Sequence, residues 1–562
     1  LRADEEALRR FYYNRGYADF RIISAYGEHD ANTNSYTVRF TVDEGQRYRF
    51  GSIELESTVP GIDEATLRRY VQTREGSYYS AKDVEDTLIA LSERVAGLGY
   101  AFAQVTPRGD RNFENQTISV VYTIDQGPRA YIERIEIRGN TRTRDYVIRR
   151  EFDLSEGDAF NQVLVQRAKR RLEMLDYFTS VEVSTAPGTE ADQVVLLVEV
   201  VEKSTGELSI GGGYTTGGGA TGGFSVEGAI GERNFLGRGQ SIRLSVGGSR
   251  NSRDYTFSFT EPYFLGRRIS AGFDIYRQTR DYDDYRSTLT GGTVRFGLPI
   301  TEALSTQVAY NLTRESYRYG GDCLADGERL PDPTVAPCNM TPILVDAIDN
   351  QSPWTKSSVS GSLIFNTIDD MRNPRDGIYA NFTTEVAGLG GDARWVKFTG
   401  RGSYYRTLSD ELDLVGLLVV GGGQIQSYGG RLRVFDNFQS DTRIIRGFRY
   451  NGIGPYDRSG GKLYHLGGTT YLNASAELQF PMPAIPESLG FRGALFADAA
   501  TLYGNELRGN VQGTGMAWRA SVGAGIIWAS PFGPLRVDYA WPVVKQERDR
   551  IQRFNFGMST RF

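Results

Sequence analysis

The sequence of 562 residues is poor in the side chains on which most chemical sites depend. It holds 2 histidines, His29 and His465, which lie far apart, so a metal centre or a histidine-based catalytic site is disfavoured. No pairing of a nucleophile with a base stands out, and we expect no catalytic residues, no metal and no cofactor. The net charge of -5 excludes a strongly basic surface, so we expect no nucleic-acid partner.

Long hydrophobic runs are also missing. The longest apolar stretch, residues 414–420, has the length of a strand, whereas a membrane-spanning helix needs about 18 apolar residues. A helical membrane protein is therefore excluded. A transmembrane β-barrel is not, because only alternate residues of its strands face lipid. The chain opens on Leu1 without a methionine, so the missing targeting segment carries no information.

Cysteine is scarce as well. Cys323 and Cys338 stand 15 positions apart in a segment rich in Asp, Gly and Pro. This pattern favours a disulfide that closes a loop in an oxidising compartment, and two unpaired thiols are the alternative.

The first two hundred residues contain a repeat. Asp43-Glu44-Gly45 returns as Asp125-Gln126-Gly127, and the offset is 82 residues. Residues 52–55 return as residues 134–137 at the same offset, and Glu75-Gly76 returns as Glu156-Gly157 at almost the same one. Several matches at a common offset indicate repeated structural units.

The order of elements within one unit follows from its periodicity. Residues 50–55 alternate like a strand, and residues 62–71 have the pattern of a short helix. A second helix and then a hairpin follow, which makes the unit β-α-α-β-β. Val84, Leu88, Leu91 and Val95 mark the helix face, and Ile118, Val120, Tyr122 and Ile124 mark the last strand.

These patterns define the N-terminal domains. We predict a partial unit at 1–46, with the second helix and the hairpin alone, and complete units at 47–127 and 128–204. The open sheet edges of such units can accept an extended peptide as an added strand. A role as simple spacers is the alternative.

The sequence after residue 204 is rich in glycine and alternates with a period of two. Tyr255, Phe257 and Phe259, for example, are separated by small or polar residues. An aromatic outer face with a small and charged inner face is typical of a transmembrane barrel, and a soluble β-sandwich is the alternative. We predict that residues 205–562 form about 16 antiparallel strands, at ~10 residues per strand plus loops.

The first and last strands of this barrel differ in character. The chain ends on a complete amphipathic strand, which we expect to pair with the first strand because an open edge is costly in a bilayer. The first strand is rich in glycine, which weakens pairing, so we predict a weak seam. A tight bend or a packing site for an aromatic ring is the alternative. The first seam strand comprises Leu208, Ile210, Gly211, Gly212, Gly213 and Tyr214. The last comprises Phe554, Phe556, Gly557, Met558, Thr560 and Phe562.

Five segments of the sequence carry a resemblance to a known family. They are residues 234–239 (Asn-Phe-Leu-Gly-Arg-Gly), 261–264 (Glu-Pro-Tyr-Phe), 445–448 (Ile-Arg-Gly-Phe), 533–536 (Gly-Pro-Leu-Arg) and 554–562. With the repeats that precede them, they make the chain similar to the BamA-type outer-membrane assembly proteins, whose repeats are called POTRA domains. The resemblance covers essentially the whole chain and implies that the units are POTRA domains three, four and five of a longer protein.

The most specific of these segments comprises Ile445, Arg446, Gly447 and Phe448. In that family it lies on a long loop that folds back into the barrel lumen, where its arginine meets acidic residues of the inner wall. Glu477 and Asp498 match those acidic partners. A guanidinium offers carboxylates a planar pair of donors and stays charged. The family pattern Phe-x-Asp-x-Gly ends here in Ala500, and a solvated loop arginine is the alternative.

The resemblance also implies a function without enzyme activity. The barrel would lie in a bacterial outer membrane with its POTRA domains in the periplasm. There the protein would fold and insert other β-barrel proteins as the core of an assembly complex, by templating their strands at the seam. The implied partners are unfolded outer-membrane protein clients, accessory lipoproteins, periplasmic chaperones and outer-membrane lipid. A related POTRA-barrel pore for protein secretion, which usually has two POTRA units, is the alternative.

Overall fold

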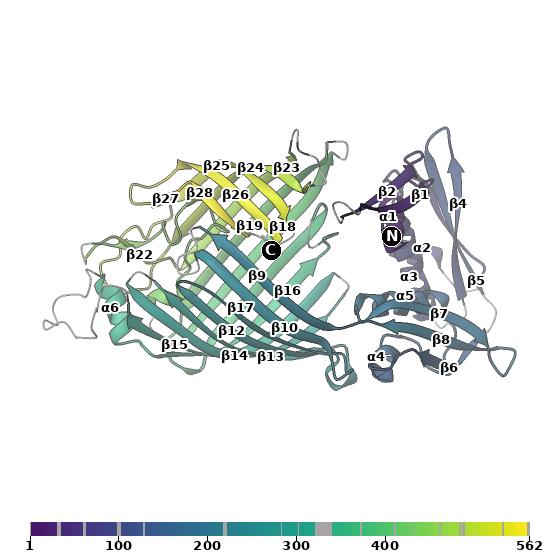
Figure 1. Cartoon of the computed structure of the whole chain (residues 1–562), viewed down its shortest axis with the longest axis horizontal. Coiled ribbons are helices and arrows are strands. Elements are labelled where there is room, and N and C mark those ends of the chain that lie inside the picture. Colours follow the sequence, from purple (N-terminus) through teal and green to yellow (C-terminus); the bar gives the residue numbers. More distant parts are fainter. Residues whose placement is uncertain are drawn as a thin grey trace. The chain divides into compact units, whose positions relative to one another are not determined.

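The computed structural model divides the chain into two compact units (Figure 1). One comprises Leu1–Thr205 with Leu236–Arg238, and the other comprises Gly206–Phe235 with Gly239–Phe562. The structure describes residues 2–30, 35–59, 63–97, 100, 103–126, 130–216, 222–282, 284–301, 303–320, 340–370, 374–409, 412–430, 432–459, 462–482, 485, 489–530 and 533–558.

The N-terminal unit consists of one partial and two complete repeats. The partial repeat comprises α1 (Arg2–Tyr13), β1 (Arg21–Asp30) and β2 (Ser35–Asp43). The second comprises β3 (Arg49–Ser57), α2 (Glu64–Leu67), α3 (Ala81–Gly97), β4 (Ala103–Asn112) and β5 (Thr117–Gln126). The third comprises β6 (Tyr131–Arg138), α4 (Asp145–Arg149), α5 (Gln162–Met174), β7 (Phe178–Pro187) and β8 (Gln193–Glu202). The predicted order β-α-α-β-β is confirmed, in sheets ordered β3-β5-β4 and β6-β8-β7.

Each complete repeat has a hydrophobic core of its own. In the second repeat, Leu91 and Val95 of α3 are buried against the alternating residues Val120 and Tyr122 of β5. In the third, Leu172 of α5 occupies the equivalent place in a separate cluster. Each complete repeat is therefore stabilised by a hydrophobic cluster of its own.

Among the described residues, no helix has the length and apolar character required to cross a membrane.

The C-terminal unit is built on one antiparallel sheet of 16 strands, the number predicted. Neighbouring strands pair in sequence order from β9 to β28 (Figure 1). The strands are β9 (Gly206–Thr215), β10 (Gly223–Phe235), β11 (Gln240–Ser249), β12 (Ser252–Glu261), β13 (Ser270–Asp281), β14 (Tyr285–Pro299), β15 (Leu304–Tyr319), β16 (Trp354–Asn366), β17 (Gly377–Gly391), β18 (Trp395–Ser409), β19 (Leu414–Ser427), β23 (Thr470–Pro481), β24 (Phe491–Tyr503), β25 (Trp518–Ser530), β26 (Gly533–Val544) and β28 (Phe554–Met558).

The two faces of this sheet differ as the alternation predicts. Tyr255, Phe257 and Phe273 point outward and are exposed. On the inner face, by contrast, Arg280 forms an ion pair of 2.7 Å with Asp254 of the neighbouring strand. An apolar outer face and a charged inner face are what a bilayer outside and water inside require.

The longest described connection between barrel strands joins β19 to β23. We call residues 428–469 the lumen loop; it contains β20 (Gly447–Phe448), β21 (Tyr456–Asp457) and β22 (Tyr464–His465). The connection from β15 to β16 contains the helix α6 (Pro342–Asp349). Cys323 and Cys338 lie outside the described residues, so the disulfide stays a prediction.

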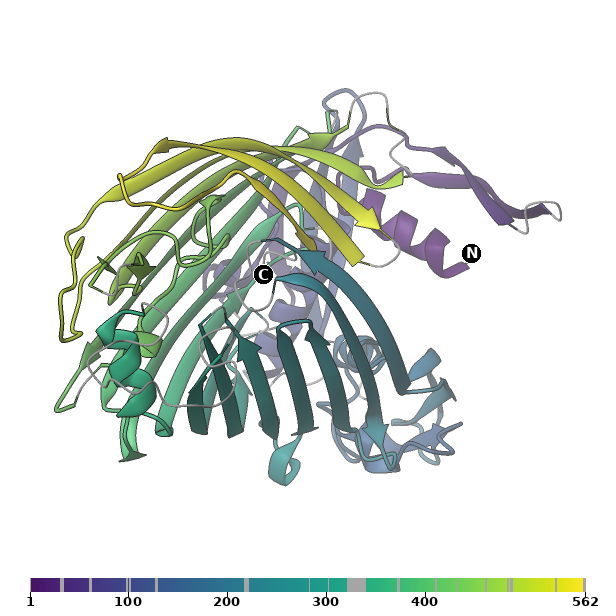
Figure 2. The ribbon, with the colours of Figure 1, turned by 60° about the vertical axis from the view of Figure 1, so that its left-hand side comes forward.

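The first and last strands, β9 and β28, stand at the two ends of the strand order. In the described part of the chain, hydrogen bonds join Thr216, the residue after β9, to Phe556 of β28. Thr216 N donates to Phe556 O at 2.8 Å, and Phe556 N donates to Thr216 Oγ1 at 2.8 Å. Tyr214 also packs on Phe556, with ring centroids 6.0 Å apart. Figure 2 shows these two ends of the sheet in teal and yellow. Thr560 and Phe562 lie outside the described residues.

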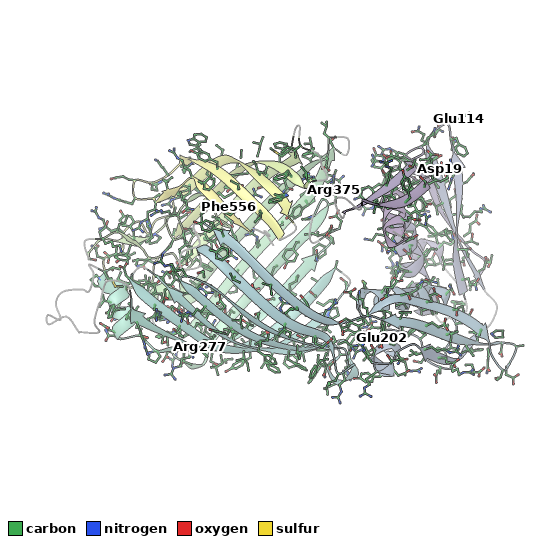
Figure 3. All side chains as sticks on the ribbon, viewed as in Figure 1. Asp19, Glu114, Glu202, Arg277, Arg375 and Phe556 are labelled. Atoms are coloured by element: carbon green, nitrogen blue, oxygen red, sulfur yellow. The ribbon has the colours of Figure 1, made fainter. Side chains whose placement is uncertain are left out.

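Glu202, at the end of β8, closes a turn of the third repeat (Figure 3). Its carboxylate accepts backbone hydrogen bonds from Thr141, Arg142 and Thr143 at 3.1, 2.9 and 2.6 Å. Partial burial raises the pKa of Glu202, but hydrogen bonds from the turn outweigh it and lower the pKa to about 2 from 4.5. Ionised Glu202 therefore stabilises the repeat above pH 4.5, and this contribution is lost as the pH falls toward 2.

We expect Glu202→Gln to lower the free energy of unfolding of the third repeat by about 2 kcal/mol at pH 7, because charge-assisted hydrogen bonds are lost. The difference from the natural sequence shrinks at low pH. Amide hydrogen exchange of this repeat in the whole chain measures the free energy of unfolding at neutral and at low pH. Glu199→Gln, an exposed position on the same strand, is the control. An equal destabilisation at pH 7 and pH 2 would contradict the role given to the charge.

Candidate functional site: the anchored lumen loop

The segment from Ile445 to Phe448 is fixed by apolar contacts on both of its sides. Ile445 and Phe448 are 1% and 2% exposed, and both belong to a cluster with Ile453, Ala500 and Leu502. Gly447 between them has φ +90°, and a Cβ there would lie 3.3 Å from the side chain of Ala540 in β26. Glycine is required here because the backbone is left-handed and approaches the wall closely. The flanking contacts aim Arg446 at the wall.

Arg446 is fully buried and meets both of its predicted acidic partners. Its Nε and Nη2 donate to the two carboxylate oxygens of Asp498, each at 2.6 Å, and its Nη1 donates to Glu477 Oε2 at 2.8 Å. Its backbone N–H also donates to Asp498, at 3.1 Å, and its guanidinium stacks on Phe496, 3.3 Å from the ring centroid. The structure therefore brings together the loop arginine and the two wall carboxylates named from the sequence.

A second arginine, Arg536 of β26, completes the cluster. It donates to both oxygens of Glu477 at 2.9 and 2.8 Å, and its Nε donates to Asp538 at 2.8 Å. Sequence reasoning did not name Arg536 or Asp538 as site residues. The signal was present, because both residues fall on the inward face of a strand whose Leu535, Val537 and Tyr539 face outward.

Pairing of opposite charges explains why so many ionised groups can be buried together. We call Glu477, Phe496, Asp498, Arg536 and Asp538 the wall anchor. With Arg446, it sets two guanidinium groups against three carboxylates, all under a tenth exposed. Desolvation of such charges costs several kcal/mol each, which bidentate pairing offsets only while every partner stays in place. The ion pairs of the cluster therefore hold the lumen loop against the wall in one arrangement.

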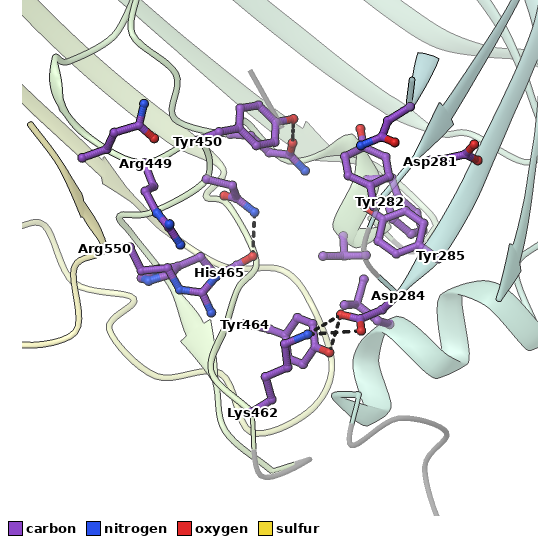
Figure 4. Close-up of a pocket in the computed structure, with 17 residues that line it drawn as sticks. Asp281, Tyr282, Asp284, Tyr285, Arg449, Tyr450, Lys462, Tyr464, His465 and Arg550 are labelled. Atoms are coloured by element: carbon purple, nitrogen blue, oxygen red, sulfur yellow. Dashed lines mark hydrogen bonds and ion pairs between the residues drawn. The ribbon is translucent and has the colours of Figure 1, made fainter. Parts of the chain in front are cut away.

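The rest of the lumen loop is tied to a different part of the wall. Lys462 and Tyr464 donate to Asp284, which follows β13, at 2.8 Å each (Figure 4). These residues border a cavity of about 380 Å³ that His465 and Arg550 also line. Burial, and then the positive charge of Arg550, lower the pKa of His465 to about 4, so the ring is neutral at neutral pH. The loop thus spans the barrel from the β13–β14 side to β26.

Ala500 stands where the family pattern ends in glycine. Its side chain is completely buried against the cluster that holds Ile445 and Phe448. The methyl group therefore adds to the packing under the loop, and Asp498 still reaches Arg446.

Comparison with known proteins agrees with this architecture. The Omp85 superfamily domain matches residues 234–562, and the POTRA description, "Surface antigen variable number repeat", matches residues 1–45, 48–127 and 130–203. The chain belongs to the Omp85 superfamily. Its POTRA matches lie within two residues of the predicted start of each repeat.

Individual Omp85 relatives are similar over the whole chain. "Outer membrane protein assembly factor BamA" of Neisseria meningitidis serogroup B is 29% identical over 607 residues, which cover 100% of this chain and 72% of the relative. BamA from Haemophilus ducreyi lacking POTRA domains 1-3 is a structural neighbour with a TM-score of 0.63 and 24% identity, covering 91% of this chain and 99% of that one. CdiB from Escherichia coli gives a TM-score of 0.51 at 13% identity, covering 99% and 96%.

Removal of the Arg446 side chain tests whether its ion pairs hold the lumen loop against the wall. Arg446→Ala leaves Glu477 and Asp498 without a buried partner, which costs about 3 to 5 kcal/mol. We expect the lumen loop to leave the wall, so that residues around 446 gain protease sensitivity and fast hydrogen exchange. Arg446→Lys keeps the positive charge but lacks the planar guanidinium that reaches both oxygens of Asp498 and Glu477 together, so we expect an intermediate effect.

Arg443 supplies a matched control for this variant. It lies on the same loop, its side chain is 70% exposed, and it pairs with Asp441. We expect Arg443→Ala to leave the loop in place. Equal exposure of the loop in the two variants would show that the wall anchor does not hold it.

Proposed function

We propose that this protein folds β-barrel proteins and inserts them into the bacterial outer membrane, as the core of an assembly complex. Its barrel lies in that membrane and its POTRA domains lie in the periplasm. The similarity to BamA over the whole chain supports this function. The mechanism needs no covalent step, because the free energy comes from the folding of the client itself.

The unequal pairing of the barrel ends is the observation that carries the proposed mechanism. β26 and β28 pair over five residue positions, from Tyr539 and Phe554 to Leu535 and Met558. In the described part of the chain, the hydrogen bonds at the other side of β28 join Phe556 to Thr216, the residue after β9. In the described part of the chain, opening this seam breaks the hydrogen bonds between Thr216 and Phe556. It also exposes a strand edge that a client strand can extend. The client's last strand would pair there before it leaves as part of a closed barrel.

The POTRA sheets offer the second kind of strand edge. In the second repeat, residues 76–79 already hydrogen-bond to the beginning of β3, and in the third, residues 157–160 do the same at β6. The opposite edges are formed by β4 and β7. We propose that clients delivered by periplasmic chaperones, and the accessory lipoproteins, add extended segments at these edges.

A secretion pore remains the second candidate. The structural likeness to CdiB is weaker than that to BamA, in TM-score and in identity. This chain also has three POTRA matches. A lumen crossed by an anchored loop favours a small, intermittent conductance, whereas a transport pore gives a steady one.

Reconstitution in liposomes tests the function. The full-length protein with its co-purifying partners is supplied with an unfolded barrel client, and the protease-resistant folded client is scored over time. We expect folding to be faster than in empty liposomes, and Arg446→Ala to reduce the rate to that of empty liposomes. Arg443→Ala retains the acceleration. Failure to accelerate folding, with a soluble substrate carried across the bilayer instead, would establish the secretion pore.

Valine substitutions in β9 test the seam. A Cβ at Gly211 would meet no atom within 4 Å, and at Gly212 the nearest atom is 3.6 Å away, so side chains fit at both positions. Each Gly→Val change adds up to about 1 kcal/mol of strand preference. We expect the double variant to close the seam more firmly and to slow client assembly by about tenfold.

Gly228→Val is the control for the seam variant. Gly228 also has no atom within 4 Å of its Cβ position, but it lies in β10, opposite Ile210 and away from β28. Assembly at the natural rate in the β9 double variant would remove the seam from the mechanism.

A further inference from the structure

The outer surface of the barrel carries a groove that the proposed function does not use. It has a volume of about 820 Å³ and crosses the strands from β18 to β26. Leu418, Leu495 and Val522 on its floor and sides are 44 to 54% exposed, which places them on the outward face. A pocket of this size is large enough for a small organic molecule.

The cross-strand register shows how the groove forms. Along one line perpendicular to the strands, each residue stands opposite the next: Tyr404, Leu418, Ala476, Ala497, Val522 and Trp541. The line begins and ends on an aromatic ring and passes over two alanines in its middle. In the next line, Gly416 and Ala524 are also small. Small residues between large ones leave a depression in which an apolar chain can reach the backbone.

The surroundings of the groove decide what fills it. The barrel lies in the outer membrane, so an outward-facing apolar depression is bathed in acyl chains. Strands alternate in direction from β9, which starts at the end joined to the POTRA domains, so β18 ends on the same, periplasmic side. Arg406 and Leu408, near the end of β18, therefore line the groove on the side of the periplasmic leaflet.

Arg406 gives the groove a charge. Its side chain is 66% exposed and stands 3.9 Å from Asp376, a long ion pair. The carboxylate of Asp376 is held by Thr407, whose Oγ1 donates to it at 2.6 Å and whose N–H donates at 3.2 Å. Arg406 is thus free to turn toward an anion without leaving Asp376 unsatisfied. A flexible cation at the membrane interface attracts lipid phosphate.

We propose that this groove is a binding site for one phospholipid of the periplasmic leaflet. An acyl chain lies over Ala476 and Ala497, and the phosphate pairs with Arg406. The site adjoins the wall anchor through a single layer of backbone, because Glu477, Phe496 and Asp498 point inward from the same stretches of β23 and β24. The inference goes beyond the proposed function and depends only on the membrane location of the barrel.

Native mass spectrometry of the whole chain in mild detergent, titrated with phosphatidylglycerol, tests the site. We expect one lipid to bind more tightly than the rest. Leucines at both alanines (Ala476→Leu with Ala497→Leu) fill the groove and weaken this first binding by about tenfold. Ala271→Leu, on the outward face of β13 and outside the groove, is the control. A heat-dependent gel shift verifies that each barrel is folded.

A second comparison tests the contact of the lipid phosphate with Arg406. The natural protein is expected to bind phosphatidylglycerol more tightly than uncharged diacylglycerol, and Arg406→Gln to abolish this preference. Unchanged first binding in the double leucine variant would overturn the site. A dimer peak that disappears in that variant would assign the groove to a second copy of the chain and would also overturn the lipid proposal.

Discussion

Pairing of a buried arginine with two buried carboxylates is the constraint around which the barrel is arranged. Arg446 is 1% exposed, and neither it nor Glu477 and Asp498 can lose its partners without leaving a bare charge in a site closed to water. Because these ion pairs are buried, they stabilise the barrel only when the guanidinium and the carboxylates are correctly placed. The loop must present the guanidinium at one place, and the strands must hold their carboxylates in register to receive it. The long lumen loop and the C-terminal strands are therefore specified together.

The seam between the first and last strands carries none of these buried ion pairs, and it differs from the anchored wall in how its strands are paired. The wall from β23 to β26 is held by full ladders and by the anchor. In the described part of the chain, Thr216, the residue after β9, hydrogen-bonds to Phe556 of β28. The lateral opening that we propose, without unfolding of the barrel, needs this contrast. Strong pairing everywhere would close the edge permanently, and weak pairing everywhere would not survive in the membrane. The wall anchor stabilises the strands from β23 to β26.

Much of the architecture could be predicted because it repeats. The offset of 82 residues predicted the repeats, and the periodicity within one unit predicted the order β-α-α-β-β. The length of the chain after residue 204 predicted about 16 strands, and the period-two alternation predicted which face is wet. The contact of Arg446 with Glu477 and Asp498 came from a family resemblance, since no local pattern joins residues 31 and 52 positions apart. Arg536 was missed because a strand arginine with an inward acidic neighbour is an ordinary lumen residue. Its contact with Glu477 depends on the fold of the wall, where two strands lie between β26 and β23.

One layer of backbone separates the wall anchor from the membrane. Ala476 and Ala497 face the bilayer, while Glu477, Phe496 and Asp498 between and beside them face the loop. Small residues outside let hydrocarbon approach the backbone, which keeps water from the strands that carry the buried charges. Ion pairs in such a dry wall are strong while they are complete and costly when one is broken. The apolar exterior and the charged interior of β23 and β24 therefore support the same state, in which the loop is docked on the wall.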